Sequence, residues 1–298
     1  MLIEFDKAGA EWVVVAYLSG DSRMLEVIKN KRDPHLVTGS TLSGVSEELV
    51  KQEDKLLNKS TDPSYIEEKR KELPKLLEGD YFLPPNMSIR QAGKKANHSL
   101  NYGLGYKTFA LKTEMVEKDA KRLVESYRNE VYPGIPVWWE TTRKRLANNN
   151  NILENCFGRK YKFMHPKGPD LFEAAYSFVP QSTVADVTNR GMILTYEDNS
   201  PDFQSVELLA QVHDSIIVQT PFDDYERVAR VCLRIALDYM NPTLEYNSRE
   251  FHIGTDIKIG HNRGNMQEVP LGNDTKEMAE SLRKMQEELD GAEARRLA

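Results

Sequence analysis

Residues 2–18 read LIEFDKAGAEWVVVAYL, and this stretch decides how the chain begins to fold. Its first apolar residues, 2–5, are typical of a short buried strand that runs into Asp6. Small residues at 8–10 then indicate a turn, and the apolar run 12–18 indicates a buried helix. The pattern therefore predicts a strand that ends at an acid and turns directly into a helix.

A second acid stands between two apolar runs in LLAQVHDSIIVQT, residues 208–220. Asp214 is predicted to lie in the polar turn of a hairpin whose strands flank it. Carboxylates on adjacent strand ends can hold two divalent cations about 3.5–4 Å apart, which activate an attacking oxygen and neutralise a leaving phosphate. Asp6 and Asp214 are therefore candidates for a two-metal site, although either acid alone is more typical of an ordinary turn or cap.

A third group of residues lies on a helix that is predicted to begin at Ser88, because Ser88-Ile-Arg-Gln91 has the form of a capping box. The helix is expected to reach about Tyr102, where Gly103 and Gly105 end it. At about 100° per residue, five polar residues share a sector roughly 100° wide: Arg90, Lys94, Asn97, His98 and Asn101. This face predicts a phosphate-binding surface, whose imidazole could stack on a base or sugar. A solvated polar stripe is the alternative interpretation.

The composition of the 298-residue chain, 40% hydrophobic and 29% charged, is typical of a globular protein with about two domains. No run approaches the roughly 20 apolar residues of a membrane span, and we expect no secretory signal. Cys156 and Cys232 are too few for a disulfide framework or a four-sulfur zinc site, and they fit a reducing compartment. A net charge of −6 argues against a nucleic-acid coat protein but allows an enzyme with a local basic cleft and acidic metal ligands.

The remainder of the chain is predicted to be mostly helical, with a solvated, highly charged helical region over 22–85. Further helices are predicted at about 115–130, 137–148, 172–195 and 228–240. The stretch NNNNILENCFGRKYKFM, residues 148–164, indicates an exposed turn followed by strand-like segments. Residues 251–259 alternate like a final strand. We find no internal repeat and no linker that would separate independent domains.

Three motifs, in the same order, resemble those of the family A, or DNA polymerase I-like, DNA polymerases. Asp6-Lys-Ala-Gly-Ala-Glu11 followed by AYLSGD resembles motif A, which reads Asp-x-Ser-x-x-Glu. Arg90-x-x-x-Lys94 with Tyr102-Gly103 matches the spacing of motif B. VHDS at 212–215 resembles motif C, usually Val-His-Asp-Glu. Shorter matches lie between them, and the resemblance covers about residues 1–260: RDPHLVTG at 32–39, FGRKYKF at 157–163 and VPQSTVADV at 179–187.

This resemblance implies a mixed α/β (α+β) fold, in which a palm with an antiparallel sheet carries a mostly helical fingers subdomain. It implies palm segments at 1–25 and 131–270, fingers at 26–130 with the motif B helix at about 88–102, and an amphipathic C-terminal tail at 271–298. The thumb and exonuclease-like domain that the family places upstream of motif A are absent from this sequence. We therefore expect either a split polymerase, completed by a second polypeptide that carries them, or a truncated product.

The resemblance also implies roles for individual residues. Asp6 and Asp214 match the two metal-binding aspartates, with two Mg²⁺ ions as the expected cofactor. Lys94 is in addition placed to act as an acid toward the leaving group. The residues that match the nucleotide-binding set are Glu11, which crowds the sugar 2′ position, His35, Arg90, Lys94, His98 and Tyr102. The residues that match contacts to the DNA are Arg159, Gln181 and His213.

The implied activity is template-directed addition of deoxynucleotides to a primer 3′ end in DNA replication. The implied partners of the chain are primer–template DNA and deoxynucleoside triphosphates. The implied location is the cytoplasm or nucleoid of a bacterium or virus-infected cell, and no association with a membrane is expected. Six residues depart from the family pattern: Gly9 for Gln, Val13 for Arg, Ser99 for Gly, Ser177 for Asn, Ser182 for Gly and Ser215 for the motif C Glu. The alternatives are a non-catalytic DNA-binding replisome subunit and a metal-dependent phosphohydrolase that uses the same acids.

The tail carries an apolar stripe at three- and four-residue spacing on a charged helix, formed by Met278, Leu282, Met285 and Leu289. The stripe predicts either a contact with the second polypeptide or, as the alternative, a helix that packs on its own palm or frays at the terminus.

Overall fold

The computed structural model describes residues 1–297, and the side chains of residues 1–292. Its internal contacts divide the chain into two compact units. The sheet unit consists of Met1–Ala10 and the segment from Gln181 onward, and the helical unit is Glu11–Pro180. The chain therefore leaves the sheet unit shortly after its first strand and returns to it within one long helix, Pro169–Glu197.

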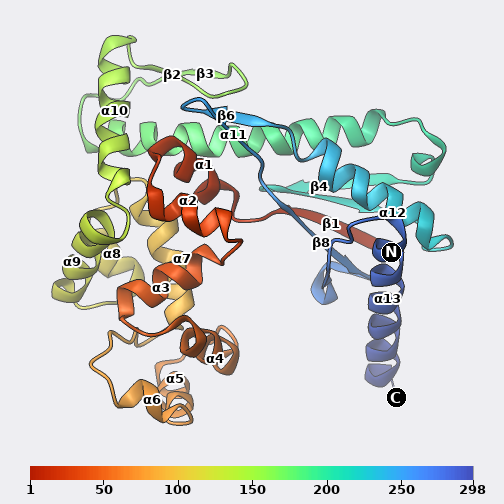
Figure 1. Cartoon of the computed structure of the whole chain (residues 1–298), viewed down its shortest axis with the longest axis horizontal. Helices are drawn as coiled ribbons and strands as arrows, with labels where there is room; N and C mark the ends of the chain where they lie inside the picture. Colours follow the sequence, from red (N-terminus) through yellow and green to blue (C-terminus); the bar gives the residue numbers. More distant parts are fainter. Residues whose placement is uncertain (298) are drawn as a thin grey trace. The chain divides into compact units, whose positions relative to one another are not determined.

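The sheet unit is built on a five-stranded antiparallel sheet in the order β4-β5-β1-β8-β9. The opening strand β1 lies at its centre (Figure 1). The elements of this unit are β1 (Leu2–Lys7), the C-terminal part of α11 (Pro169–Glu197), η2 (Pro201–Phe203), β4 (Glu207–Val212), β5 (Ser215–Gln219), α12 (Tyr225–Leu233), η3 (Arg234–Tyr239), β6 (Leu244–Tyr246), β7 (Arg249–Phe251), β8 (Thr255–Gly260), η4 (Arg263–Asn265), β9 (Gln267–Val269) and α13 (Thr275–Leu297). The predicted hairpin is present as β4-β5. The strand expected over 251–259 is not the final one, because β9 follows it.

The side chains of β1 alternate between the two faces of the sheet. Ile3 and Phe5 are fully buried in an apolar core that also contains residues of β5, β8, α12 and α13. Glu4 and Asp6 belong to the opposite face and are partly exposed. One face of the sheet is thus committed to the core, whereas the other presents carboxylates. The strand extends to Lys7, so Asp6 lies inside it and not after it as the pattern predicted.

The helix α13 carries the apolar stripe that was expected in the C-terminal tail. Met278 and Leu282 are fully buried and Leu289 is almost so, all within the core that covers β1, while Met285 packs against it from the edge. Full burial of a side chain of this size contributes about 1.5–3 kcal/mol. The stripe therefore belongs to the core of the sheet unit, in agreement with the interpretation of a helix packed on its own palm.

The helical unit joins a set of mostly short helices to one small hairpin. Its elements are α1 (Ala10–Ser19), α2 (Ser22–Lys29), α3 (Pro34–Ser43), α4 (Glu47–Leu57), α5 (Pro63–Arg70), α6 (Pro74–Leu77), α7 (Ile89–Leu100), α8 (Tyr106–Thr113), α9 (Glu117–Ser126), η1 (Tyr127–Val131), α10 (Gly134–Asn148), β2 (Ile152–Glu154), β3 (Lys160–Lys162) and the N-terminal part of α11. Helices α3 and α7 lie side by side (Figure 1). They can approach each other closely because Gly93 and Gly39 have no Cβ atom. A Cβ on Gly93 would collide with the carbonyl oxygen of His35, and one on Gly39 would collide with that of Ile89.

The helix α7 begins where the sequence predicted, and two side chains cap it. Ser88 Oγ accepts a hydrogen bond from the backbone N–H of Gln91 at 3.2 Å. Glu53 Oε2 accepts one from the N–H of Ile89 at 2.7 Å, and Glu53 is itself paired with the buried Arg70 at 2.6 Å. Two of the free N–H groups at this helix start are therefore satisfied by side chains, only one of which the sequence pattern identified.

Substitution of the fully buried Ser88 by Ala is expected to lower the free energy of unfolding by about 1–2 kcal/mol, because the N–H of Gln91 loses its acceptor. Urea denaturation of the two proteins measures the change. Ser99→Ala, at the other end of the same helix, is the matched control and is expected to change the midpoint little. An equal loss in both variants would show that Ser88 does not act as a cap.

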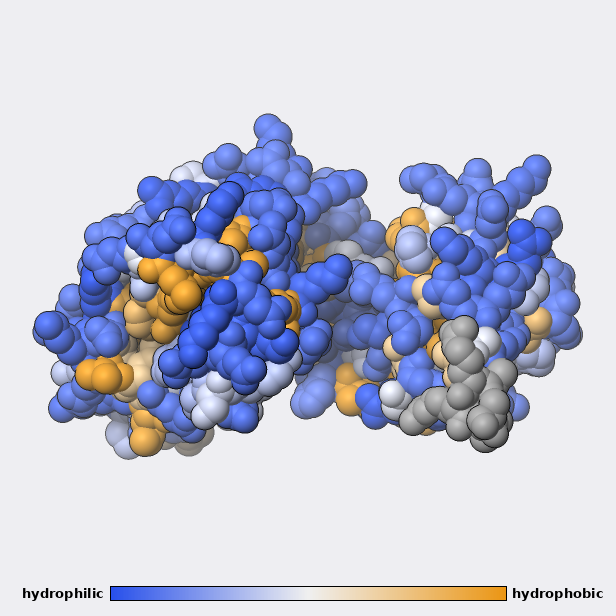
Figure 2. Space-filling view, turned by 90° about the horizontal axis from the view of Figure 1, so that it is seen from below, coloured by the Kyte–Doolittle hydropathy of each residue, from blue (hydrophilic) through white to orange (hydrophobic). Residues whose placement is uncertain are grey.

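The face of the molecule in Figure 2 is mostly hydrophilic, with apolar side chains in separate patches. Three large aromatic side chains, Tyr127, Tyr132 and Tyr176, are buried inside the helical unit and are all 2% exposed or less. No helix in the part of the chain that is described has the length and apolar character needed to cross a membrane.

Candidate active site

The strand β1 and the hairpin β4-β5 bring the two predicted metal-binding acids to one end of the sheet. Asp6 is directly across from Ser215 on β5, and Ser215 pairs with Val212 across the hairpin. His213 and Asp214 form the two-residue turn between these strands, and His213 adopts a left-handed conformation with φ of 54°. Asp214 is therefore one residue away from the cross-strand partner of Asp6.

The two acids offer carboxylate oxygens, which are the ligands that Mg²⁺ prefers. Within the described residues, no three Asp, Glu, His or Cys side chains form a cluster that could hold an ion by themselves. Mg²⁺ is commonly bound by one or two carboxylates together with substrate phosphates, and not by an all-protein cage. Asp6 and Asp214 therefore fit a divalent ion whose coordination a phosphate-bearing substrate completes.

Further charged groups surround Asp6 on the same face of the sheet. Lys258 Nζ lies 3.3 Å from Asp6 Oδ2 and 3.6 Å from Glu4 Oε2. Burial opposes the charged form of Lys258, but these two carboxylates outweigh it and raise its pKa. Asp256, directly across from Asp6 on β8, has a pKa raised by burial and by the charges of Glu268 and Asp6. The face is thus rich in negative charge, which the ammonium of Lys258 balances in part.

Lys7, at the end of β1, is a buried cation to which none of the sequence motifs assigns a role. Its ammonium donates hydrogen bonds to the carbonyl oxygens of Met240, at 2.6 Å, and Ile253, and to Thr255 Oγ1 at 2.9 Å. Burial lowers the pKa of Lys7 to about 7, against the attraction of Asp214. These three bonds fasten the strand end that carries the first acid. Strict alternation along the strand places Lys7 on the core face, and this was the available signal in the sequence.

The helix α7 carries the two predicted triphosphate-binding cations in different environments. Arg90 Nε donates to Asp33 Oδ2 at 2.7 Å, and its guanidinium lies 3.8 Å from Asp54 Oδ2. Burial opposes ionisation of Asp33, but the hydrogen bond from Arg90 lowers its pKa overall. Lys94, one turn further along, is exposed. The helix therefore offers one cation that carboxylates orient and one that extends into solvent.

The two predicted histidines of the nucleotide set lie next to each other. The ring centroids of His35 and His98 are 5.5 Å apart, and His35 Nδ1 is 3.1 Å from the side-chain nitrogen of Asn97. Burial lowers the pKa of His35 to about 4, and the nearby Asp33 opposes this only in part. His35 is therefore neutral at physiological pH, and its imidazole can take part in hydrogen bonds but carries no positive charge.

The prediction that five polar residues of α7 form one exposed face is wrong for two of them. Asn97 and Asn101 are 1% and 2% exposed, and the Tyr127 hydroxyl lies 3.0 and 2.6 Å from their side-chain oxygens. Trp139 Nε1 donates to the main-chain oxygen of Asn101 at 2.8 Å. Residues of η1 and α10 thus cover this part of the helix, which a periodicity argument on α7 alone cannot detect. The partly or fully exposed residues of the face are Arg90, Lys94 and His98.

Glu11 and Tyr102, 91 positions apart in the sequence, are in direct contact. The Tyr102 hydroxyl donates a hydrogen bond to Glu11 Oε2 at 2.5 Å. Burial, followed by the negative charge of Glu11, raises the pKa of Tyr102 well above its ordinary value, so the phenol remains a donor. The helical unit therefore joins two predicted nucleotide-binding residues that no local sequence pattern links.

The three predicted DNA-contacting residues are all exposed. Arg159 lies in the loop between β2 and β3, where its backbone N–H donates to Asn155 Oδ1 at 3.1 Å. Gln181 is on α11 and His213 is in the β4-β5 turn, so both belong to the sheet unit, whereas Arg159 belongs to the helical unit. Each side chain is accessible to a ligand from solvent, and the role of each in contacting DNA stays a prediction.

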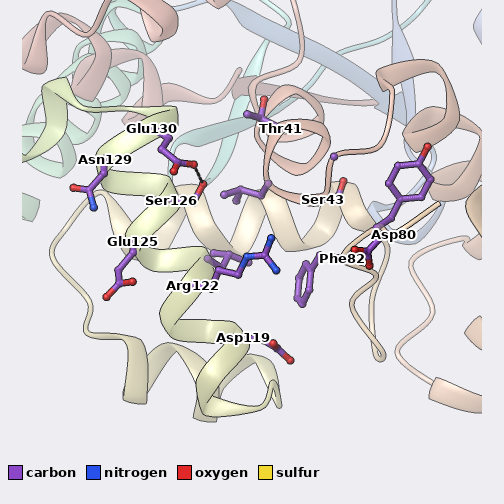
Figure 3. Close-up of a pocket in the computed structure, with 14 residues that line it drawn as sticks. Thr41, Ser43, Asp80, Phe82, Asp119, Arg122, Glu125, Ser126, Asn129 and Glu130 are labelled. Carbon is purple, nitrogen blue, oxygen red and sulfur yellow. Dashed lines mark hydrogen bonds between the residues drawn. The ribbon is translucent and has the colours of Figure 1, made fainter.

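A polar cavity of about 720 Å³ lies in the helical unit, and none of the predicted site residues lines it (Figure 3). It is lined from α3, α9 and the loop around Phe82, and Ser126 donates a hydrogen bond to Glu130 in its wall. The lining contains one basic residue, Arg122, and four acidic ones: Asp80, Asp119, Glu125 and Glu130. This excess of negative charge disfavours binding of a triphosphate in the cavity.

The chain is similar in sequence to known DNA polymerases. The chain is 25% identical to the thermostable DNA polymerase I of Thermus thermophilus over 243 residues, which are 79% of this chain and 24% of that protein. It is 25% identical to the DNA polymerase of Mycobacterium phage D29 over 263 residues, which are 87% of this chain and 34% of that one. The chain thus spans about a quarter to a third of the length of these relatives.

A solved structure shares the fold. The polymerase domain of Pol1 from M. smegmatis, in complex with DNA primer-template and dNTP, matches with a TM-score of 0.61 at 16% identity, over 88% of this chain and 39% of that one. This likeness confirms the predicted combination of an antiparallel sheet with mostly helical parts. The profile described as DNA polymerase family A matches residues 85–265, more than half of the chain. The chain therefore belongs to DNA polymerase family A.

Proposed function

We propose that this chain is the palm-and-fingers part of a template-directed DNA polymerase, which adds deoxynucleotides to the 3′ end of a primer. The observation that carries the proposal is the strand register that sets Asp6 across from Ser215, next to Asp214, in a chain of this family. In this proposal Asp6 and Asp214 are the catalytic acids, and residues of α7 bind the incoming nucleotide.

Asp6 and Asp214 are the residues that would hold two Mg²⁺ ions. When bound, the ions would lower the pKa of the primer hydroxyl and neutralise charge on the leaving pyrophosphate. Lys7 keeps the end of β1 in place through its three hydrogen bonds, so that the carboxylate of Asp6 has a fixed position. Pre-positioning of this kind reduces the reorganisation that the reaction requires.

Arg90 and Lys94 bind the β and γ phosphates of the nucleotide in this proposal. Asp33 orients the guanidinium of Arg90, and the exposed Lys94 is able to donate a proton to the leaving pyrophosphate. The neutral imidazole of His35 assists by hydrogen bonding, and His98 lies beside the sugar. Charge-assisted hydrogen bonds to phosphate are roughly twice as strong as neutral ones, which favours these two cations as the main anchors.

The pair Glu11–Tyr102 discriminates between sugars in this proposal. The Glu11 carboxylate, held by the Tyr102 hydroxyl, crowds the 2′ position of the incoming nucleotide. Deoxynucleotides fit beside it, whereas the 2′-hydroxyl of a ribonucleotide meets a side chain that cannot move away without losing its hydrogen bond.

Glu11→Ala is expected to raise the ratio of ribonucleotide to deoxynucleotide incorporation about tenfold, because it removes the crowding at the 2′ position. Single-nucleotide extension with matched ribo- and deoxynucleotides measures the ratio. Tyr102→Phe keeps the ring but releases Glu11, and we expect a smaller rise in the same direction. A ratio unchanged in Glu11→Ala would remove Glu11 from the gate.

Primer extension by the chain alone, and mixed with a candidate polypeptide that carries a thumb and an exonuclease-like domain, tests the proposal as a whole. Incorporation of nucleotides supports a polymerase, and a large gain in processivity in the mixture supports the second polypeptide. DNA binding without incorporation would instead favour a non-catalytic replisome subunit. Release of phosphate without primer growth would favour a phosphohydrolase.

The residues that would contact the primer–template in this proposal are Arg159, Gln181 and His213.

A further inference from the structure

The side chain of Asn97 on α7 lies at the centre of a buried hydrogen-bond network. Asn97 is 1% exposed, and Thr38 and Tyr127, which contact it, are both fully buried. The hydroxyls of Thr38 and Tyr127 each lie 3.0 Å from Asn97 Oδ1. Asn97 Nδ2 lies 3.2 Å from the main-chain oxygen of Pro34 and 3.1 Å from His35 Nδ1. Each polar atom of this amide therefore has two partners.

The contact with Pro34 fixes which atom of the Asn97 amide faces His35. A carbonyl oxygen can only accept a hydrogen bond, so the amide atom beside it must be the nitrogen. The reversed orientation would place two oxygens, Asn97 Oδ1 and the Pro34 carbonyl, against each other. One hydrogen of Nδ2 is therefore directed at the Pro34 oxygen and the other at His35 Nδ1.

The contact with Asn97 decides where the neutral imidazole of His35 carries its proton. An amide nitrogen only donates, so Nδ1 must accept, and the single proton of the ring must lie on Nε2. A proton on Nδ1 would face the N–H of the amide. The other charged or titratable groups that act on the ring come from α7 and the start of α3: Asp33, Arg90, Lys94 and His98.

We propose that Asn97 is a positioning residue that holds His35 with its proton on Nε2, so that this N–H donates to a phosphate oxygen of the incoming nucleotide. The inference rests on the proposed nucleotide-binding function of His35. His35 is partly exposed, and within the described part of the chain its Nε2 has no hydrogen-bond partner. An ionised phosphate oxygen only accepts, so a ring with its proton on Nδ1 would present a lone pair to it and repel it. Asn97 is buried and thus acts on the nucleotide through His35.

Nitrogen NMR of the full chain with isotope-labelled histidine tests the tautomer without DNA or nucleotide. His35→Gln identifies the signals of this ring among those of the six histidines. In the unaltered chain at neutral pH we expect an unprotonated Nδ1 and a protonated Nε2. Asn97→Leu keeps the approximate size of the side chain but removes its N–H, and we expect the two tautomers to mix. Asn97→Asp reverses the contact, because a carboxylate accepts, and we expect a protonated Nδ1.

Asn101→Leu is the matched control for the NMR measurement. The side-chain oxygen of Asn101 also contacts the Tyr127 hydroxyl, at 2.6 Å, but Asn101 lies one turn further along α7 than Asn97. We expect the His35 signals of this variant to match those of the unaltered chain. Thermal unfolding verifies that each variant is folded. A protonated Nδ1 in the unaltered chain, or His35 signals unchanged in both Asn97 variants, would overturn the role of Asn97.

A double-mutant cycle in primer extension tests the phosphate contact. Asn97→Leu is expected to raise KM for the incoming nucleotide about three- to tenfold, with the Kd for primer–template within about twofold, because a hydrogen bond to a charged group is weakened. In the His35→Gln background the same substitution should change KM by less than about twofold, since Asn97 acts only through the ring. An equal rise in both backgrounds would show that Asn97 has only a structural role.

The outcomes distinguish this inference from the proposed function. If the chain extends primers but His35 carries its proton on Nδ1, the inference fails and the proposed function stands. If the chain, alone or mixed with a second polypeptide, incorporates no nucleotide, the proposed function fails and the phosphate contact fails with it, whereas the NMR spectrum still decides whether Asn97 sets the tautomer. The expected spectrum together with a KM effect that disappears in the His35→Gln background supports the inference.

Discussion

Replacement of Asp6 or Asp214 by Asn is expected to abolish primer extension, with a loss of roughly a thousandfold or more in rate. Each carboxylate would be shared by the proposed ions, whose stabilisation of the transition state is worth several kcal/mol, and each 1.4 kcal/mol corresponds to about tenfold. Asn keeps the size and shape of the side chain, so the fold should persist. Extension of a labelled primer under single-turnover conditions measures the loss.

Asp256→Asn is the matched control for these two variants. Asp256 is directly across from Asp6 on the neighbouring strand β8 and shares its face of the sheet, but it is not one of the two proposed ligands. We expect this variant to keep activity within about fivefold, because it changes only the surrounding field. Near-normal extension by folded Asp6→Asn or Asp214→Asn would exclude the two-metal mechanism. If Asp256→Asn loses as much activity as Asp6→Asn or Asp214→Asn, the acidic face of the sheet would contribute to activity through its total charge and not through two specific ligands.

Lys94→Ala is expected to reduce kcat/KM for the incoming nucleotide by about a hundredfold while leaving the Kd for primer–template within about twofold. An exposed ammonium that binds triphosphate contributes a charge-assisted hydrogen bond of roughly 1.5–3 kcal/mol, which accounts for most of this loss. Part of the effect should appear in kcat, because Lys94 is also proposed to protonate the leaving pyrophosphate. Nucleotide titration at saturating DNA, together with a separate DNA-binding measurement, resolves the two quantities.

Lys95→Ala is the control for Lys94, since both lysines are exposed on α7 but differ by one residue, about 100° around the helix. We expect Lys95→Ala to leave nucleotide use nearly unchanged. If both substitutions weaken DNA binding and nucleotide use to the same extent, α7 is a general DNA-binding face. Arg90 is less suited to this comparison, because its removal would also leave Asp33 and Asp54 without their partner.

The local features of the site could be predicted from short stretches of sequence. The apolar residues 2–5 indicated a strand that leads to Asp6, apolar runs around 213–215 indicated a hairpin with Asp214 in its turn, and Ser88 marked the start of α7. These features depend on residues a few positions apart, because pleating, turn geometry and capping are short-range effects. The apolar stripe of the tail could also be predicted from the sequence, but the surface against which it packs could not.

Which of these residues are in contact depends on how the chain packs in three dimensions. The register that sets Asp6 across from Ser215, the contact of Glu4 with Ser215 over a separation of 211 positions, and the bond between Glu11 and Tyr102 join residues that no local pattern links. The burial of Asn97 and Asn101 was missed because it depends on helices packed against α7, not on α7 itself. Such contacts follow from how elements distant in the sequence pack and pair, and this packing is chosen by the burial of apolar surface over each whole unit.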